Sequence, residues 1–237
     1  MLSDVGGPGQ QRLKAGRVAI VGLGGVGAPA ALYLAAAGIG GLTLIDDDAV
    51  SLSNLQRQVL FSADDLGRPK VQVGQARLHG LNPHVDVQTQ PLRLTTANAE
   101  ALLSDHDAVI DGTDDFETRL AVNAACVALK APLVSGALGR WDGQVGVFHG
   151  RPCYRCLVPD IPPDAETCAR VGVIGALAGV IGAMTALEAI KIVIGAGRPL
   201  AGRLLLYDGL AGATRTVTVP ADPACPTCAG VAQASPG

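Results

Sequence analysis

Residues 17 to 38, "RVAIVGLGGVGAPAALYLAAAG", decide the fold of this chain. The segment opens with a short β-branched run that ends at glycines, and the helix-forming stretch after it closes at Gly38. A second apolar run, "LTLID" at 42 to 46, follows at about the spacing that a parallel strand–helix–strand crossover needs. The segment therefore predicts a strand, a glycine turn, a helix and a second, parallel strand.

Later segments repeat this alternation and then become rich in strands. The alternating sequence "QVGVFH" indicates a switch to antiparallel pairing with one solvated face. We predict an α/β, Rossmann-like fold with a mostly parallel sheet, helices on both faces and a β-rich C-terminal part. We expect a single domain over 10–230, with flexible ends at 1–9 and 231–237. The other expected helices span about 69–81, 97–104, 116–130 and 172–194, and the other expected strands 85–92, 108–114, 132–137, 144–149, 203–208 and 214–219.

Charge and hydropathy indicate which partners and which cellular environment to expect. The net charge of -3 and the pI near 5.7 give no overall basic field, so we expect no nucleic acid partner. No secretory signal opens the sequence, and we expect a cytoplasmic protein. The uncharged run 171–187, with its Gly175-xxx-Gly179 spacing, raises the alternative of a membrane helix. Because it barely reaches spanning length before Glu188, we expect a helix buried in the core or in a subunit interface, and no membrane.

The glycine turn carries the first functional signal. "GLGGVG" matches the G-x-G-x-x-G pattern through Gly22, Gly24 and Gly27, with Gly25 between them, and lies between a strand and a helix. Glycines let the backbone approach a phosphate, and the helix N-terminus offers unpaired N–H groups to it. Asp46 follows the second strand, where a carboxylate can accept both ribose hydroxyls. This pattern suits NAD and ATP enzymes alike, and a turn kept only for packing is the alternative.

The polar loop 47–68 favours a triphosphate over a dinucleotide. Its segment "SNLQRQ" brings Asn54, Arg57 and Gln58 to the same sheet edge, and Lys70 follows in the first turn of the next helix. Preorganised cations stabilise charge that develops at phosphorus. A solvated surface arginine and lysine are the alternative. No histidine occupies an obvious strand-end motif, which argues weakly against hydride transfer.

Acidic residues follow the next predicted strand in "DGTDD". Asp111, Asp114 and Asp115 fall at the crevice where α/β sheets bind ligands. Magnesium binds through one or two carboxylates plus phosphate oxygens, so Asp114 is a candidate magnesium ligand. Either Asp114 or Asp115 could also cap the helix that begins near Phe116.

The cysteines form two C-x-x-C pairs, "CYRC" at 153–156 and "CPTC" at 225–228. Four thiolates fill a tetrahedral zinc site, so we predict one structural zinc ion per chain that ties the C-terminal tail down; redox-active pairs are the alternative. Cys168 is either a nucleophile or a plain cysteine, and Cys126 is expected in the core. The predicted zinc ligands are Cys153, Cys156, Cys225 and Cys228.

Taken in order, these segments resemble the MoeB/ThiF family, which shares its adenylating domain with ubiquitin-activating enzymes. The resemblance covers roughly residues 10 to 230 and rests on several long motifs in register. The matching blocks are "GLGGVG", "LIDDDAVSLSNLQRQ", "GRPK", "DGTDD", "PLVSGA", "PCYRCL", "TCARVGVIG" and "MTALEAIKI".

The resemblance implies ATP-dependent adenylation of the C-terminal glycine of a ubiquitin-like sulfur carrier similar to MoaD or ThiS, ending in Gly-Gly. The nucleotide-binding part would be about 10–137, and the carrier-binding and zinc part about 138–230. A separate donor, such as a cysteine desulfurase or a rhodanese, would supply sulfur. The pathway stays open between thiamine, molybdopterin, tRNA thiolation and amino-acid sulfur supply.

The resemblance also implies roles for single residues. Arg57 and Lys70 would neutralise charge, Asp114 would hold magnesium and Asp46 would bind the ribose. Family members are homodimers in which the arginine matching Arg57 reaches the partner's nucleotide. Cys168 falls on the crossover-loop cysteine that bonds the carrier's terminus in some members and is dispensable in others. The implied nucleotide-binding set is Gly22, Gly24, Gly25, Gly27, Asp46, Ser53, Asn54, Arg57, Lys70, Asp114 and Asp115.

Two features depart from the family pattern. Asp115 stands where members such as MoeB have asparagine, which puts the nucleotide contact of that side chain in question. A segment reading like "RYxRQ", usual near the N-terminus, has no counterpart, and we expect its phosphate contact to be lost or replaced. An NAD oxidoreductase and a nonenzymatic nucleotide-binding scaffold are the alternative functions.

Overall fold

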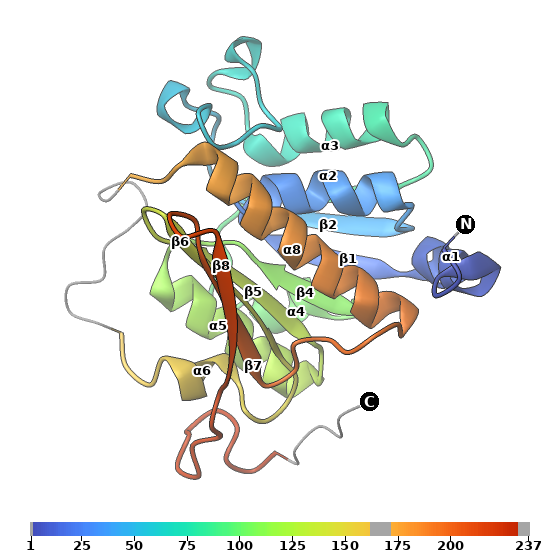
Figure 1. The fold of residues 1–237 in the computed structure, drawn as a ribbon. Helices are drawn as coiled ribbons and strands as arrows, with labels where there is room; N and C mark the ends of the chain where they lie inside the picture. The colour runs from blue at the N-terminus through green and yellow to red at the C-terminus, as the bar shows by residue number, and fades with distance from the viewer. Residues whose placement is uncertain (1, 162–171, 232–237) are drawn as a thin grey trace.

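A single mixed sheet organises the computed structural model, which describes residues 2–161 and 172–231 (Figure 1). Its eight strands run in the order β3-β2-β1-β4-β5-β6-β7-β8; the first five are parallel and the last three antiparallel. This confirms the predicted mostly parallel sheet with a β-rich C-terminal part. The strands are β1 (Arg17–Val21), β2 (Gly41–Ile45), β3 (Asp86–Gln90), β4 (Ala108–Asp111), β5 (Leu133–Leu138), β6 (Asp142–Phe148), β7 (Arg203–Asp208) and β8 (Ala213–Thr218).

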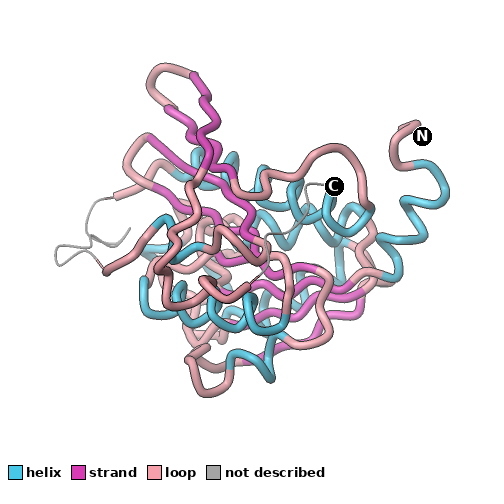
Figure 2. The backbone as a smooth tube through the Cα atoms, turned by 90° about the horizontal axis from the view of Figure 1, so that it is seen from below, coloured by secondary structure: helices cyan, strands magenta, loops and turns pink. Residues whose placement is uncertain are grey.

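Helices cover both faces of the sheet, as predicted. In Figure 1, α2, α3 and α8 lie on one face and α4 and α5 on the other, and Figure 2 shows the antiparallel strands extending beyond the helices at one end. Alternate residues of β1 enter the two cores: Val18 and Ile20 face α2 and α8, whereas Ala19 and Val21 face α5. The described helices are α1 (Gly6–Ala15), α2 (Gly27–Ala37), α3 (Lys70–Leu81), α4 (Ala99–Leu103), α5 (Phe116–Leu129), α6 (Tyr154–Leu157) and α8 (Gly175–Ile194), with short 3-10 helices η1 (Leu52–Asn54) and η2 (Ala63–Asp65).

Helix α8 is long and apolar enough to cross a membrane, but half of its most apolar window is buried inside the fold. It packs on α2 and on β5 and β6. Gly182 permits the close crossing, because a Cβ atom there would lie 2.3 Å from Cγ of Pro29. The apolar run therefore forms part of the core, as predicted.

The glycine-rich start of the chain differs from the prediction. Residues 6–9, expected to be flexible, form the first turns of α1. Gln10 Nε2 donates to the carbonyl oxygen of Ala37 at 3.0 Å, and Leu13 is buried against the core. Composition alone does not reveal these two tertiary contacts, which lie farther along the helix.

Candidate nucleotide-binding site

The strand ends create a cleft at the point where the strand order reverses. Val21, the last residue of β1, pairs with both Ile45 of β2 and Asp111 of β4, so the three strands end level. Open α/β sheets bind ligands at this switch point. A cleft of about 470 Å³ lies there, within the range typical of small-molecule sites. Its lining includes Gly22, Gly24, Gly25, Asp46, Asp47, Asp48, Asn54, Arg57, Gln58, Lys70, Arg93, Gly112, Thr113, Asp114, Asp115, Arg119 and Tyr154.

The glycine turn forms one wall because only glycine fits its backbone. Gly22 has φ +85°, and a Cβ atom on Gly27 would lie 1.9 Å from the carbonyl oxygen of Gly22. The turn leads directly into α2, which starts at Gly27. Since a helix N-terminus presents unpaired N–H groups and positive dipole charge, this wall suits an anion.

Asp46 lies beside the turn as the sequence predicts. One carboxylate oxygen accepts from the backbone N–H of Leu23 at 2.6 Å, and the other accepts from that of Asp48 at 2.8 Å. Burial raises the pKa of Asp46, and the neighbouring Lys70 ammonium partly offsets this rise. The carboxylate is therefore fixed at the turn by backbone donors, next to the open cleft.

Lys70 is the first residue of α3 and is only 3% exposed. Its Nζ lies 2.7 Å from Oδ2 of Asp48 and 3.9 Å from Oδ1 of Asp46. A cation at the start of a helix opposes the helix dipole, so helix stability does not account for this placement. The ammonium instead pairs with Asp48 and lies beside Asp46 in the cleft lining.

The loop between β2 and α3 holds its cationic and amide groups over the cleft. Backbone hydrogen bonds close its base, including those from Val50 to Arg68 and from Lys70 to Asp48. Arg57 Nη1 donates to the carbonyl oxygen of Ser53 at 3.2 Å. The cleft thus gains side chains from a loop that is anchored at both ends.

Of Ser53 and Arg57, Arg57 is the one whose side chain lines the cleft. The Ser53 hydroxyl is exposed and bonds Ser51, and it is not part of the cleft lining; its carbonyl orients Arg57 instead. The family resemblance implied that Arg57 reaches a partner's nucleotide. Its side chain lines the cleft of its own chain, with Cδ 3.7 Å from where a Cβ of Gly25 would lie.

The two acids that follow β4 have different environments. Asp115 caps α5, accepting from the backbone N–H groups of Glu117 and Thr118. It also pairs with Arg93 at 2.8 Å; although partial burial opposes the shift, the contacts with Thr118 and Arg93 lower its pKa. Asp114 is exposed in the cleft and its carboxylate has no hydrogen bond to any residue that the structure describes. The capping role thus falls to Asp115, and Asp114 stays available to a cation.

Two arginines in the lining were missed from the sequence. Arg119, 5% exposed, pairs with Asp111 at 3.2 Å and donates to Ser135 and to the carbonyl oxygen of Gly136, so it joins the ends of β4 and β5 below the cleft. The sequence could have indicated this role, because Arg119 lies on the apolar face of the helix predicted over 116–130. Arg93 comes three residues after β3, and the strand-end rule applied to Asp46 could have found it.

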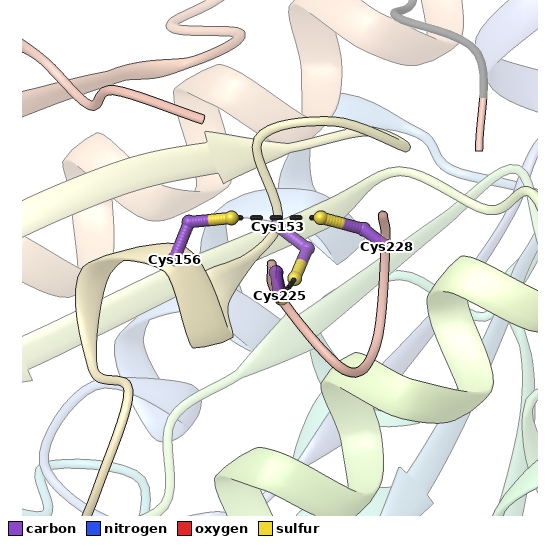
Figure 3. A group of neighbouring side chains, drawn as sticks. All are labelled: Cys153, Cys156, Cys225 and Cys228. Atoms are coloured by element: carbon purple, nitrogen blue, oxygen red, sulfur yellow. Dashed lines mark hydrogen bonds between the residues drawn. The ribbon is translucent and has the colours of Figure 1, made fainter. Parts of the chain in front are cut away.

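The four cysteines of the two C-x-x-C pairs converge on one another (Figure 3). Their sulfur atoms all lie within 4.8 Å of one another, with Cys153 and Cys225 at 3.7 Å and Cys156 and Cys228 at 3.5 Å. Tetrahedral zinc with Zn–S bonds of about 2.3 Å requires sulfurs about 3.8 Å apart. These two contacts join one C-x-x-C pair to the other, and all four sulfurs lie together, so the donor set fits a tetrahedral zinc site.

The remaining cysteines are Cys126 and Cys168. Cys126 is 2% exposed, and burial raises its pKa, which fits the predicted core role. Cys168 lies outside the described residues, between Ile161 and Gly172.

Known proteins match this chain over almost its whole length. The model of the ThiF family matches residues 1–227. A protein of Thermus thermophilus named sulfur carrier protein adenylyltransferase is 48% identical, over 96% of this chain and 88% of its own length. The Escherichia coli molybdopterin-synthase adenylyltransferase is 46% identical, over 93% of this chain and 90% of its own length.

Solved structures share the architecture. The crystal structure of E. coli MccB with ATP superposes with a TM-score of 0.80 at 25% identity, covering 93% of this chain and 69% of that one. A selenomethionine crystal structure of PaaA gives a TM-score of 0.77 at 26% identity, covering 90% and 66%. Sequence, fold and cleft agree, and the chain belongs to the ThiF family.

Proposed function

We propose that this protein is an adenylyltransferase that uses ATP to activate the C-terminal carboxylate of a ubiquitin-like sulfur carrier. The observation that carries the proposal is the cleft at the switch point, where a glycine turn, two cations and an exposed carboxylate meet. The names of the relatives support the same reaction, since those from Thermus thermophilus and E. coli are adenylyltransferases.

In the proposed reaction a carrier carboxylate oxygen bonds to the α-phosphorus of ATP, and the bond from that phosphorus to the pyrophosphate oxygen breaks. Arg57 and Lys70 stabilise the charge that moves onto the phosphate oxygens. Asp46 binds the ribose hydroxyls, and the N-terminus of α2 faces the phosphates. The product is an acyl-adenylate prepared for thiocarboxylate formation.

We assign Asp114 as the residue that holds Mg²⁺ with the nucleotide. Its carboxylate is exposed in the cleft and has no competing partner within the described ranges 2–161 and 172–231. Magnesium usually takes one or two protein carboxylates together with phosphate oxygens, which this single free acid can satisfy. Bound there, the ion would neutralise phosphate charge.

The proposal is tested by carrier-dependent exchange of labelled pyrophosphate into ATP. Purified chain is incubated with ATP, Mg²⁺ and carriers that end in Gly-Gly, one ThiS-like and one MoaD-like. Exchange should require both the carrier and its terminal glycine. Absence of exchange with every carrier tried would instead favour a nucleotide-binding scaffold.

An NAD oxidoreductase is the alternative to test beside it. No histidine is among the described residues that line the cleft, so the cleft offers no imidazole for proton transfer to a hydride acceptor. Titration with NADH and with ATP discriminates the two functions, because the proposal requires tighter binding of ATP.

We propose one structural zinc ion per chain on the four converging cysteines. The sulfur geometry and the near-complete burial of Cys153, Cys225 and Cys228 support it. Metal analysis of purified protein should give about one zinc per chain. A stable chain without metal would contradict the assignment.

We also propose that two copies associate through the loop between β2 and α3. Leu52 and Val59, on either side of Arg57, are 70% and 64% exposed, and Ile174 nearby at the start of α8 is 40% exposed. Clustered exposed side chains of this size are typical of an interface. Light scattering should give a dimer, and Leu52→Asp with Val59→Asp should give a monomer.

Cys168 remains the candidate nucleophile for the carrier's terminus. Its thiolate would attack the acyl-adenylate carbonyl, forming a thioester and releasing AMP. Cys168→Ala should retain pyrophosphate exchange and lose any covalent adduct with the carrier. Sulfur would come from a separate donor such as a cysteine desulfurase or rhodanese, in the cytoplasm, and pull-down of the native carrier would identify the pathway.

A further inference from the structure

Gln58 lines the cleft, and one buried polar atom of its side chain has no partner in the fold. Gln58 is 3% exposed, yet its side-chain Oε1 has no hydrogen bond to any described residue. Buried side-chain oxygens are nearly always bonded, because an unmet acceptor costs free energy. An exception at a ligand site is the expected signature of a group that awaits its ligand.

The backbone holds this side chain over the glycine turn. The N–H of Gln58 donates to the carbonyl of Asn54, and its own carbonyl accepts from Phe61, so both backbone groups are bonded. Gln58 Nε2 lies 3.8 Å from where a Cβ atom of Gly24 would be. The carboxamide is therefore part of the cleft wall, beside Arg57.

The chemistry of the acceptor limits what it can bind. Phosphate oxygens are acceptors and cannot satisfy Oε1, whereas Arg57 and Lys70 already offer donors to phosphates. The proposed reaction brings two kinds of donor to this wall: the last backbone N–H of the carrier's tail, and a water bound to the nucleotide's divalent ion. Both would present an N–H or O–H to the amide oxygen.

We infer that Gln58 is a further substrate-binding residue, whose amide oxygen accepts a hydrogen bond from a donor brought by the substrates. The inference rests on the proposed adenylation and adds a contact to it. It gives the buried amide oxygen a partner that the described residues do not provide.

The distinguishing test measures stability and activity together. Gln58→Met keeps the length of the side chain and removes both amide groups. Because no bond within the fold is lost, the thermal midpoint should stay equal or rise, while kcat/KM for carrier-dependent exchange falls about 10-fold. Gln72→Met is the matched control, since Gln72 is exposed on α3 and outside the cleft lining.

Two arms identify the donor. If it is the peptide N–H, ATP affinity measured without carrier is unchanged and the KM for the carrier rises. If it is the metal-bound water, ATP affinity with Mg²⁺ falls and affinity without the ion does not. Either result supports the inference.

Other outcomes overturn it. An exchange rate within twofold of wild type, or a fall of several degrees in melting temperature that Gln72→Met does not share, would make Gln58 a structural residue. Should Gln58→Met not fold, Gln58→Asn, which withdraws the same amide by one methylene, is measured in the same way. Exchange by the wild-type chain in the same series separates failure of this inference from failure of the proposed function.

Discussion

Asn123 of α5 links Cys153, one of the four clustered cysteines, to the helix beneath the cleft. Its Nδ2 donates to the sulfur of Cys153 at 3.5 Å, and its Oδ1 accepts from the backbone N–H of Tyr154 at 2.8 Å. The residue is 1% exposed on α5, one turn after Arg119. Tyr154 in turn lines the cleft, and the centre of its ring lies 5.9 Å from Cζ of the Arg119 guanidinium. The cysteine cluster and the cleft therefore share one support.

Asn123→Leu should weaken metal retention without removing a ligand. Groups that bond metal-bound thiolates commonly contribute 10–100-fold in metal affinity, so zinc should pass to a competing chelator about 10-fold more readily. Ala124→Leu, at the exposed neighbouring position of α5, is the control. Equal retention by the two variants would show that the cluster does not depend on Asn123.

Arg57 and Lys70 should each be needed for adenylation, and both in the same chain. Arg57→Ala and Lys70→Gln should each slow carrier-dependent exchange by two to three orders of magnitude, since each removes a cation from a preorganised site. Lys14→Gln, on the exposed side of α1, should not.

Mixing the two variants tests the placement of Arg57 in its own cleft. Heterodimers of Arg57→Ala and Lys70→Gln chains, isolated with two affinity tags, should stay inactive, because each chain's cleft lacks one cation. If Arg57 served the partner's cleft, one of the two sites would be complete and the isolated heterodimer would regain about half of wild-type activity.

Two glycines of α8 should respond in opposite directions to alanine. A Cβ atom at Gly182 would lie 2.3 Å from Cγ of Pro29 and 2.6 Å from the carbonyl oxygen of Val26, so Gly182→Ala should lower the free energy of unfolding by about 1–3 kcal/mol. A Cβ atom added at Gly179 would meet no atom of another element within 4 Å, so Gly179→Ala should raise the free energy of unfolding by about 0.5–1 kcal/mol. Thermal denaturation of the pair measures both; similar shifts would contradict the packing of α8 on α2.

Helix α8 was predicted from the sequence, but the position of its closest contact with another helix was not. The run predicted a packed core helix, but the glycine spacing pointed to Gly175 and Gly179, whereas the close helix crossing occurs at Gly182. Gly175 instead meets the loop, because its Cβ would lie 2.0 Å from the carbonyl oxygen of Gln56. A pattern within one element cannot say which other element packs against it.

The cleft likewise contains residues that the sequence located and pairings that it did not. Strand-end position located Asp46 and Asp114, since parallel strands place the residues after them at one edge. The pairing of Arg119 with Asp111 and of Arg93 with Asp115 depends on distances between segments far apart in the sequence. The structure also gives a role to Asp115, which stands where members such as MoeB have asparagine: its carboxylate caps α5 and pairs with Arg93.

Asp65 should make the loop that carries Arg57 sensitive to acid. It accepts from the backbone and hydroxyl of Ser62 and pairs with Arg77 at 3.0 Å and Arg68 at 3.1 Å, near the end of that loop. The Ser62 hydrogen bonds, with help from Arg77, lower the pKa of Asp65 from 3.8 to about 2. A carboxyl whose pKa is lower in the folded state stabilises the fold above pH 4 and loses that contribution as the pH falls toward 2.

Asp65→Asn should therefore lower the free energy of unfolding by about 1 kcal/mol at pH 7, the usual contribution of a capping side chain. The difference from wild type should shrink as the pH falls below 4, because the wild-type carboxyl becomes protonated as well. Melting temperatures of both chains at pH 7, 5, 4 and 3 measure this convergence, with Asp64→Asn, an exposed neighbour, as control. A difference that is constant over this range would mean that Asp65 acts through its shape rather than its charge.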